Sequence, residues 1–413
     1  MQTNLADFIR DTPQGQEADS ILRACVHCGF CNATCPTYQL LGDELDGPRG
    51  RIYQIKSVLE GAPVTEETRD HLDRCLTCRS CESTCPSGVQ YGRLVDIGRE
   101  VVEAKVPRSL PARVLRWLLR QVLPHPARFA FLLGLGRLFR PLLPRVLKDA
   151  VPLARPAGTW PAPRHPRRIV IAGGCVQPSL APDIDSAAAR VLDAIGISAE
   201  SVSIGCCGAV SYHLNAQAEG LDTARLAIDR LCAALDAGAE SIVVSASGCA
   251  SFVVEYAHHL SGDPAYAVKA TQVTSALIDL TSLLSREAAA FDRALAHSLA
   301  RSPAKPEAIA FHSPCTLQHG MKNKGNVERL LTVAGFRTTV VADSHLCCGS
   351  AGTYSILQPA LSATLKANKL AALEAGGPSR IATANIGCLT HLAGGAKRPV
   401  EHWIELIAER LGV

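Results

Sequence analysis

Hydrophobic and polar positions along the C-terminal two thirds of the chain follow a repeating order. Short apolar runs that predict buried strands lie at 168–172, 241–244, 308–311 and 380–383. Helical periodicity follows at 186–195 and 326–334, and nearer the N-terminus at 50–59 and 66–73. Strands that alternate with helices are typical of parallel α/β modules, so we expect such modules here.

Cysteine elements follow these strands in two copies. The first copy has Cys175, Cys206-Cys207-Gly208 and Gly248-Cys249, and the second has Cys315, Cys347-Cys348-Gly349 and Gly387-Cys388. Cys315 follows Cys175 by 140 positions, Cys347 follows Cys206 by 141, and Cys388 follows Cys249 by 139. This spacing implies duplication of one module. We expect the cysteines at the carboxyl ends of the strands, where open α/β sheets place their ligands.

Two further cysteine runs near the N-terminus share the pattern C-x2-C-x2-C-x3-C-P. They are Cys25, Cys28, Cys31 and Cys35-Pro36, and Cys75, Cys78, Cys81 and Cys85-Pro86. In two-cluster bacterial ferredoxins the fourth cysteine of such a run ligates the other cluster. The pattern predicts two [4Fe–4S] clusters. The predicted ligands are Cys25, Cys28, Cys31 and Cys85 for cluster 1, and Cys35, Cys75, Cys78 and Cys81 for cluster 2.

Zinc binding and disulfide bonding account less well for these cysteines. Paired zinc knuckles use C-x2-C pairs, but they give no reason for two four-cysteine runs that each end in Cys-Pro. A disulfide framework is not needed by a chain of 413 residues, which can bury proper cores. No apolar signal segment follows the polar start at 1–4, and the cysteine count of 17 is odd. We therefore expect metal ligation in a reducing, cytoplasmic setting.

Charge is distributed unevenly, although the net charge of +4 is too small to indicate a nucleic-acid-binding protein. No acidic residue occurs between positions 107 and 148, whereas basic residues do at Arg108, Arg113, Arg116, Arg120, Arg128, Arg137, Arg140, Arg145 and Lys148. Prolines and arginines interrupt every apolar run, so the segment cannot supply the ~20 apolar residues of a membrane span. We expect short helices that contact a membrane surface or a partner subunit, or an ordinary helical hairpin.

Length and patterning together predict a multidomain α+β and α/β chain. The predicted regions are a helical two-cluster ferredoxin-type domain at 1–106, a basic helical connector at 107–166, module one at 167–300 and module two at 301–413. A dinucleotide-binding G-x-G-x-x-G after a strand and a P-loop are both missing from the sequence. We expect neither a flavin site nor catalytic residues in this chain.

The repeated module resembles the cysteine-rich CCG domain of heterodisulfide reductase subunits and of the iron–sulfur subunits of several flavin dehydrogenases. The family pattern ends in C-x2-C, but Phe252 and His391 stand at the last cysteine positions here. The resemblance implies an additional metal or redox site in module two, at Cys315, Cys347, Cys348, Cys388 and His391. A weaker candidate in module one comprises Cys175, Cys206, Cys207 and Cys249. The alternative is a structural or redox-active thiol role.

The remaining thiol and imidazole groups carry weaker signals. Cys232 lies on an apolar helical face, so we expect a small buried side chain without a ligand role. Other histidines near the cysteine elements are His213, His312, His319 and His345. We expect them to be packed or exposed, with a hydrogen bond to sulfur or a role in proton transfer as the alternative.

Three segments carry a narrower resemblance: GPRGRI at 47–52, the run from 75 to 92, and HSPCTLQHG at 312–320. By these segments the chain resembles the iron–sulfur subunits of bacterial glycolate oxidases, and the resemblance covers essentially the whole chain. The resemblance implies a complex whose FAD-binding subunits oxidise glycolate to glyoxylate, while this subunit passes electrons to a quinone or other acceptor. It also implies peripheral attachment to the inner face of the cell membrane. The alternatives are the equivalent subunit of a lactate, anaerobic glycerol-3-phosphate or heterodisulfide-reductase-like complex, and a zinc-stabilised scaffold.

Overall fold

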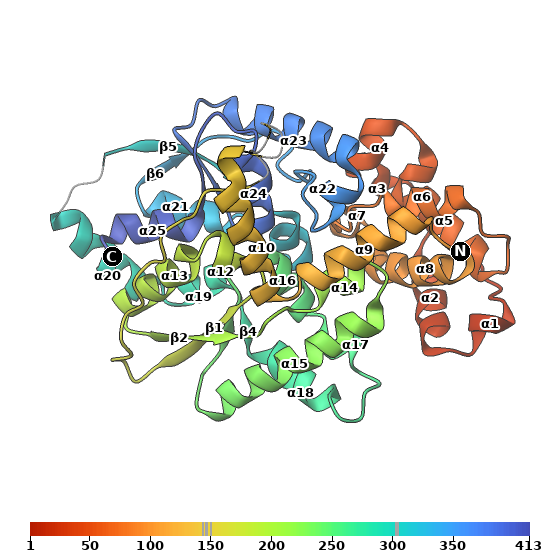
Figure 1. The fold of residues 1–413 in the computed structure, drawn as a ribbon, viewed down its shortest axis with the longest axis horizontal. Helices are drawn as coiled ribbons and strands as arrows, with labels where there is room; N and C mark the ends of the chain where they lie inside the picture. Colours follow the sequence, from red (N-terminus) through yellow and green to blue (C-terminus); the bar gives the residue numbers. More distant parts are fainter. Residues whose placement is uncertain (143, 145–147, 149–150, 302–304) are drawn as a thin grey trace.

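A computed structural model describes residues 1–142, 144, 148, 151–301 and 305–413. Helices of the N-terminal domain gather at one end of the molecule, and two parallel sheets with their helices form the rest (Figure 1). The predicted fold class, a helical N-terminal domain followed by a duplicated α/β module, is confirmed. Arg145 of the basic connector lies outside the described residues.

The N-terminal domain is helical. Its helices are α1 (Asp7–Arg10), α2 (Pro13–Ala24), α3 (Phe30–Ala33), α4 (Pro36–Leu41), η1 (Glu44–Asp46), α5 (Pro48–Leu59), α6 (Glu66–Asp73), α7 (Ser80–Thr84) and α8 (Tyr91–Lys105). Thr65 caps α6 by accepting a hydrogen bond from the Thr68 amide. Helix α5 begins two residues before the predicted start because Pro48 suits the first helical position. Leu22, Ile55 and Leu94 are fully buried where these helices pack.

The connector forms longer helices than the prolines predict. These are α9 (Leu110–Val122), α10 (Pro126–Phe139) and the short η2 (Arg140–Leu142). Pro111 and Pro126 lie in the first turns of α9 and α10, where a missing amide hydrogen costs nothing, so they start helices instead of cutting them. Within the described residues, none of the helices combines the length and the apolar character that a membrane span needs, as the sequence predicts.

Module one contains a four-stranded parallel sheet in the order β2-β1-β3-β4. Its strands are β1 (Arg168–Gly173), β2 (Ser198–Ser203), β3 (Ile242–Val243) and β4 (Leu277–Ile278). Its helices are α12 (Gln177–Leu180), α13 (Asp183–Ala194), α14 (Ala209–His213), α15 (Gln217–Asp236), α16 (Ser247–Val253), α17 (Tyr256–His259), α18 (Ala267–Ala276), α19 (Leu280–Arg286) and α20 (Ala288–Arg301). Each cysteine element lies in the segment that follows a strand, at the predicted edge of the sheet.

Module two repeats this sheet in the order β6-β5-β7-β8, again fully parallel. Its strands are β5 (Glu307–His312), β6 (Phe336–Thr338), β7 (Arg380–Thr383) and β8 (Val400–His402). Its helices are η3 (Thr316–Gly320), α21 (Asn326–Val333), α22 (Tyr354–Leu357), α23 (Pro359–Glu374), α24 (Ile386–Ala393) and α25 (Trp403–Leu411). The equal strand orders confirm the duplication that the cysteine spacing predicts.

One hydrophobic core joins the two modules. Ile169 of β1 and Ile309 of β5 belong to the same buried cluster, together with Trp403 of α25. The neighbouring Val170 points to the opposite face of its sheet and packs with Ile228 of α15. Because alternate residues of each strand enter different cores, helices cover both faces of each sheet. The loops that carry the cysteines are therefore held on a rigid two-module body.

Candidate iron–sulfur centres

The two N-terminal cysteine runs adopt the same unusual backbone conformation. His27 and Gly29 in the first run, and Thr77 and Arg79 at the equivalent positions of the second, all have positive φ angles, between 51° and 84°. Three of these four residues are not glycine, so the conformation carries a steric cost that the surrounding structure must offset. Residues in the left-handed region occur in loops that turn backbone amides toward one centre, as in the anion-binding loops of many iron–sulfur sites.

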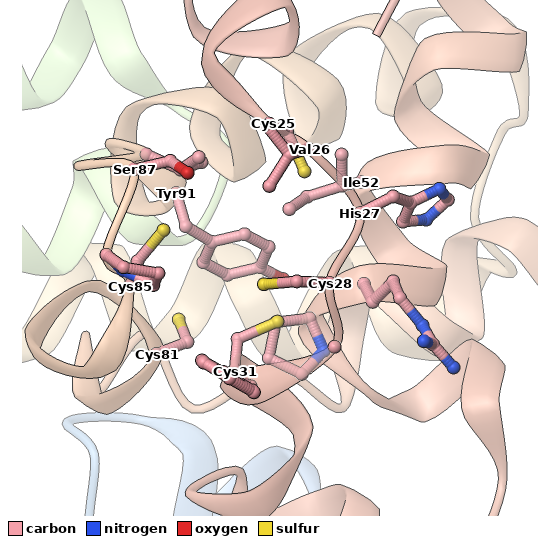
Figure 2. Close-up of a pocket in the computed structure, with 16 residues that line it drawn as sticks. Cys25, Val26, His27, Cys28, Cys31, Ile52, Cys81, Cys85, Ser87 and Tyr91 are labelled. Carbon is pink, nitrogen blue, oxygen red and sulfur yellow. The ribbon is translucent and has the colours of Figure 1, made fainter.

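Cysteines from both runs converge on one cavity of about 430 Å³, shown in Figure 2. Its lining includes Cys25, Cys28, Cys31 and Cys85, together with Cys81 and Tyr91. Burial raises the pKa of the Cys31 thiol to about 11, with a further contribution from the neighbouring Cys25. Such a thiol would remain protonated at neutral pH unless a metal cation stabilised its thiolate. The structure thus brings Cys85 of the second run to the three leading cysteines of the first.

A second cavity of about 310 Å³ adjoins the first, and its lining includes Cys35, Cys75, Cys78 and Cys81. Here the fourth cysteine of the first run meets the three leading cysteines of the second. Burial raises the pKa values of the Cys78 and Cys81 thiols well above their ordinary range. The two cavities share Cys81 and Tyr91 in their lining, so the two groups of cysteines are direct neighbours.

The separation of the sulfur atoms distinguishes a cluster from a single zinc ion. Zn–S bonds of about 2.3 Å in a tetrahedron place sulfur atoms roughly 3.8 Å apart. All eight N-terminal cysteines are described, and no three of them bring their sulfur atoms within 4.8 Å of one another. The cysteines therefore surround spaces wider than one zinc ion fills, which fits a cubane of four irons and argues against the zinc-scaffold hypothesis.

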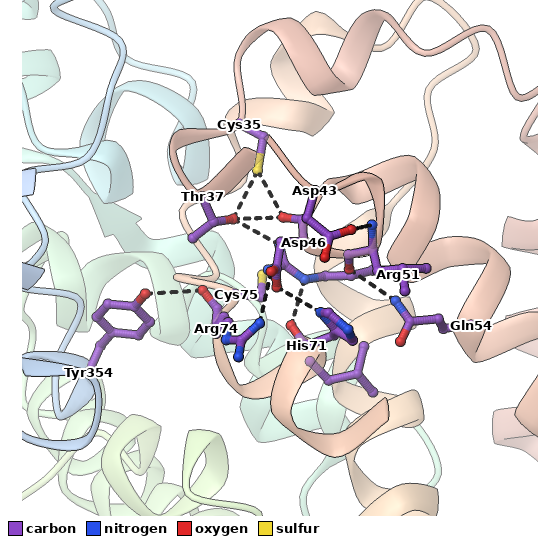
Figure 3. Close-up of polar contacts among 12 residues, drawn as sticks. Cys35, Thr37, Asp43, Asp46, Arg51, Gln54, His71, Arg74, Cys75 and Tyr354 are labelled. Atoms are coloured by element: carbon purple, nitrogen blue, oxygen red, sulfur yellow. Dashed lines mark hydrogen bonds and ion pairs between the residues drawn. The ribbon is translucent and has the colours of Figure 1, made fainter. Parts of the chain in front are cut away.

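A buried ionic network supports the second cavity (Figure 3). Arg51, which is 1% exposed, donates to Asp46 at 3.2 Å and to the Thr37 hydroxyl at 3.1 Å. Arg74 and His71 complete the partners of the Asp46 carboxylate at 2.9 and 3.0 Å. The Thr37 hydroxyl lies 3.3 Å from Cys35 Sγ, so the network reaches a predicted ligand. A buried cation beside these sulfurs would stabilise the extra negative charge of a reduced cluster.

Tyr91 also contacts a predicted ligand of the second cavity. Its hydroxyl donates to Cys75 Sγ at 3.6 Å, and the Thr77 amide donates to the same sulfur at 3.4 Å. Neither Arg51 nor Tyr91 is predicted as a site residue from the sequence, although both lie in segments that carry the family resemblance. The sequence gives one sign of a functional role for Arg51, which is a charged residue on the apolar face of the helix predicted at 50–59.

The second cavity also adjoins module two. Leu76 and Tyr354 belong to one buried cluster with Cys315 and Cys347, and the Cys78 thiol packs against it. Two hydrogen bonds fix this junction: the Tyr354 hydroxyl donates to the Arg74 carbonyl at 3.2 Å, and His319 Nδ1 lies 2.9 Å from the Ser83 hydroxyl. The predicted second cluster and the thiols of module two are thus placed side by side.

Four thiols of module two form a continuous series of contacts from Cys315 through Cys347 and Cys348 to Cys388. Gly349 has a φ of 87°, and a Cβ there would lie 2.7 Å from the Ser362 carbonyl, so only glycine fits after the cysteine pair. The buried Lys369 ammonium donates to the Asp343 carbonyl at 2.7 Å and lies near three of the thiols. This arrangement offers several sulfur donors and one cation, all of them buried.

The histidines of module two divide into two groups. A ring nitrogen of His312 lies within 4.8 Å of the Cys348 and Cys388 sulfur atoms. His391, the imidazole at the family's ligand position, does not belong to this group, and its Nε2 lies 3.4 Å from the Ser362 hydroxyl. Burial lowers the pKa of His312 to about 3 and that of His391 to about 4, so both rings are neutral at pH 7. Among the described residues, the ring of His345 forms no hydrogen bond with a predicted ligand. Its backbone carbonyl accepts a hydrogen bond from the ring of His319.

Module one holds an equivalent but more apolar pocket. Contacts between thiols run from Cys175 through Cys206 and Cys207 to Cys249. Phe252 stacks beside them against Tyr212 and His259, at ring-centroid distances of 5.2 Å in both cases. Among the described residues, no three metal-binding side chains of this module lie within 4.8 Å of one another. The structure does not bring these cysteines into a compact donor group of the kind found in module two.

Two further candidates lie away from the centres. Cys232 is buried and contacts the Lys269 carbonyl and the Gln272 side chain, as expected of a packed thiol. His213 lies 3.7 Å from Asp96 at the junction of module one with the N-terminal domain. Neither residue approaches a group of cysteines that could bind a cluster.

Comparison with known families supports this geometry. Residues 21–89 match the 4Fe-4S dicluster domain, and residues 169–253 and 309–393 each match the cysteine-rich domain known as CCG. The cofactor prediction of iron–sulfur clusters is therefore confirmed at the level of the family, while the individual ligands are not identified by the match.

Relatives extend the likeness to the full chain. The glycolate oxidase iron–sulfur subunit of Escherichia coli K12 is 54% identical over 100% of this chain and 99% of its own length. The probable glycolate oxidase iron–sulfur subunit of Bacillus subtilis 168 is 30% identical over 91% and 89%. Lactate utilization protein A of Shouchella clausii KSM-K16 is 26% identical but spans only 47% of this chain. By its full-length similarity, the chain belongs to the family of glycolate oxidase iron–sulfur subunits.

Proposed function

We propose that this chain is the electron-transfer subunit of a complex that oxidises glycolate, and that it relays electrons from FAD-containing subunits to a quinone or other acceptor. The carrying observation is the convergence of eight cysteines on two neighbouring cavities in a chain with full-length similarity to such subunits. When bound, [4Fe–4S] clusters supply one-electron transfer at potentials that the protein sets. The lactate-linked alternative is not favoured, because that relative matches only half of the chain.

The proposed ligand sets cross between the two runs. Cluster 1 is held by Cys25, Cys28, Cys31 and Cys85, and cluster 2 by Cys35, Cys75, Cys78 and Cys81. The support is the lining of the two cavities: the first brings Cys85, with Cys81, to the three leading cysteines of the first run, and the second brings Cys35 to the three leading cysteines of the second run. Exchange of the fourth ligand ties the two runs together and keeps both clusters in one rigid domain.

The face around cluster 1 is the proposed docking site for the flavin-containing partner. Cys28 is exposed, and the apolar side chains Val26, Phe30 and Tyr53 near it are 68%, 61% and 55% exposed. Cys78, a proposed ligand of cluster 2, in contrast packs against module two. An exposed apolar surface beside a redox centre suits a protein partner that must approach closely, since electron transfer weakens steeply with distance.

The decisive experiment is reduction by glycolate with and without the partner subunits. The isolated chain, purified anaerobically, should not oxidise glycolate with a dye acceptor, because its sequence contains no dinucleotide-binding motif for a flavin. Addition of the purified FAD-containing subunits should allow glycolate to bleach the visible absorption of its clusters. Turnover of glycolate by the isolated chain would contradict the proposal.

We also propose that the connector hairpin, α9 with α10, attaches the complex peripherally to an anionic membrane surface. The support lies in the orientation of α9. Arg116 and Arg120 turn inward and pair with Asp73 and Glu219, at 3.2 and 2.6 Å. The apolar side chains of the hairpin instead face solvent, including Leu110, Val114, Trp117, Leu118, Phe131, Leu132, Leu138 and Phe139.

Helix α9 thus turns two of its arginines toward the protein and exposes its apolar side chains to water, and an apolar surface would stabilise this arrangement by covering them. The exposed Arg113 and Arg128 lie on the same two helices, and the absence of acids between 107 and 148 gives the surface a positive sign. Apolar residues flanked by arginines match the boundary between acyl chains and anionic headgroups. Attachment there would place the subunit beside a quinone dissolved in the membrane.

Module two is proposed to hold a further metal or redox centre at Cys315, Cys347, Cys348 and Cys388. The support is their continuous series of thiol contacts and their position next to Cys78 of cluster 2. Module one, where Phe252 fills the last ligand position, is the weaker candidate. Metal analysis of the anaerobic protein tests this part, because the two cubanes account for ~8 irons and any further metal exceeds that count.

A further inference from the structure

The buried histidine of module two that best fits a metal ligand is His312, which does not stand at the family's ligand position. It is the last residue of β5, only 2% exposed, and three positions before Cys315. One of its ring nitrogens, Cys348 Sγ and Cys388 Sγ all lie within 4.8 Å of one another. A group this compact has the dimensions of a site for a single metal ion.

The hydrogen bonding of the imidazole leaves one nitrogen free. Nδ1 lies 2.9 Å from the Thr383 hydroxyl on the neighbouring strand β7, whereas Nε2 is buried and has no partner among the described residues. A buried polar atom without a partner is unfavourable, and a metal ion bound at Nε2 would remove this cost. A histidine that binds metal commonly uses its second ring nitrogen to donate to an oxygen, as Nδ1 can here to Thr383.

Comparison of the two modules shows whether packing of the fold requires the polar residues of this site. At the position equivalent to His312, also three residues before the first cysteine, module one has Ala172. At the position equivalent to the buried Lys369, 20 residues after the glycine of the cysteine pair, it has Ile228. Module one therefore keeps the fold with apolar residues at both places, and the fold itself does not require the imidazole or the ammonium.

We propose that Cys348, Cys388 and Nε2 of His312 bind one metal ion of the thiolate-preferring class, zinc or iron, with His312 in place of the missing fifth cysteine. Two thiolates with one imidazole suit either metal. Thr383 is a positioning residue, because its hydroxyl occupies Nδ1 and leaves Nε2 for the ion. His391 is not a ligand in this proposal, and its Nε2 lies beside the Ser362 hydroxyl. The proposal deepens the proposed module-two centre and is independent of the electron relay.

The test compares the anaerobically purified full-length chain with His312→Ala, His312→Cys and the matched control His391→Ala. Iron and zinc are counted per chain, and X-ray absorption at the edge of the extra metal reports its nitrogen and sulfur neighbours. Wild type and His391→Ala should contain one metal centre beyond the ~8 irons of the cubanes. His312→Ala should lose it, and His312→Cys should retain it with the nitrogen neighbour replaced by sulfur.

Thr383→Val provides a milder second variant, since it keeps the side-chain shape and removes only the hydroxyl. Loss of an outer hydrogen-bond partner typically lowers metal affinity 10- to 100-fold, which chelator competition measures. Unchanged visible absorption of the cubanes in each variant shows that the chain is folded. The proposal is overturned if His312→Ala keeps the extra metal, if wild type contains none, or if His391→Ala loses it. Reduction of the cubanes by glycolate with the partner subunits tests the relay separately.

Discussion

Arg79 and Glu255 form an ion pair of 3.0 Å that joins the loop of the second cysteine run to module one. Arg93 of α8 pairs with the same carboxylate at 2.8 Å. Burial alone would raise the pKa of Glu255, but the hydrogen bond from Arg93 and the charge of Arg79 lower it to about 2. The N-terminal domain is thus fixed to the α/β body by a partly buried ionic junction beside the proposed cluster 2.

Glu255→Gln should weaken this junction. Loss of the charged hydrogen bonds should lower the free energy of unfolding by roughly 1.5–3 kcal/mol at pH 7. Because the folded pKa lies below the ordinary value of 4.5, the contribution is present above pH ~4.5 and is lost as pH falls toward 2. Anaerobic denaturant unfolding measures it, with Glu240→Gln as a control that removes the exposed Arg167–Glu240 pair. Equal effects of both variants at pH 7 would contradict the assignment.

Cys35→Ser tests the crossed ligand sets. The variant should damage the cluster held by Cys75, Cys78 and Cys81, although these cysteines are distant in sequence, and should leave the first run's cluster intact. Electron paramagnetic resonance of the dithionite-reduced protein should show one of two cubane signals altered. Combination with Cys78→Ser should alter no further cubane, whereas combination with Cys28→Ser should alter both. Cys232→Ser, at a buried thiol away from both cavities, should change neither signal.

Tyr91→Phe should lower the reduction potential of the cluster that Cys75 is proposed to hold. The hydroxyl donates to Cys75 Sγ and stabilises the more negative reduced state, so its removal favours the oxidised state. One neutral hydrogen bond of roughly 0.5–1.5 kcal/mol corresponds to about 20–60 mV for one electron. Potentiometric titration measures the shift. Tyr354→Phe, whose hydroxyl bonds the Arg74 carbonyl and no sulfur, should shift the potential less.

Leu118→Asp in the connector hairpin should weaken binding to vesicles. An acidic side chain on the exposed apolar face of α9 disfavours insertion among acyl chains and opposes anionic headgroups. Flotation with anionic vesicles at low salt should retain the wild-type complex and release most of the variant. Leu226→Asp changes a leucine on α15 of module one that is also exposed, and should leave flotation unchanged. If both variants float like wild type, the hairpin does not bind the membrane.

Periodicity and cysteine spacing predicted most of the architecture. The helix at 66–73 and the strand at 380–383 occur with the predicted bounds. The edge strand β2 was missed because only its first two residues are buried, so it lacks an apolar run. The connector helices were predicted too short, since a proline at a helix start looks in sequence like a proline that ends one.

The candidate site was predictable only as far as its ligands form local patterns. Regular spacing identified the cysteines, whereas Arg51, Tyr91 and His312 act through contacts across the fold. His391 was favoured over His312 because it stands at a known family position. The burial and the free Nε2 of His312 become apparent only when β5 and β7 lie side by side.

The order of reduction after rapid mixing with glycolate tests the central claim most directly. Oxidation of a 2-hydroxy acid releases two electrons, which a flavin can accept as a pair and the clusters only singly. In the anaerobic complex, flavin absorption should therefore bleach first, and cluster absorption should follow at a rate that supports turnover. Clusters that stay oxidised while the complex turns over, or that are reduced before the flavin, would contradict an electron relay through this chain.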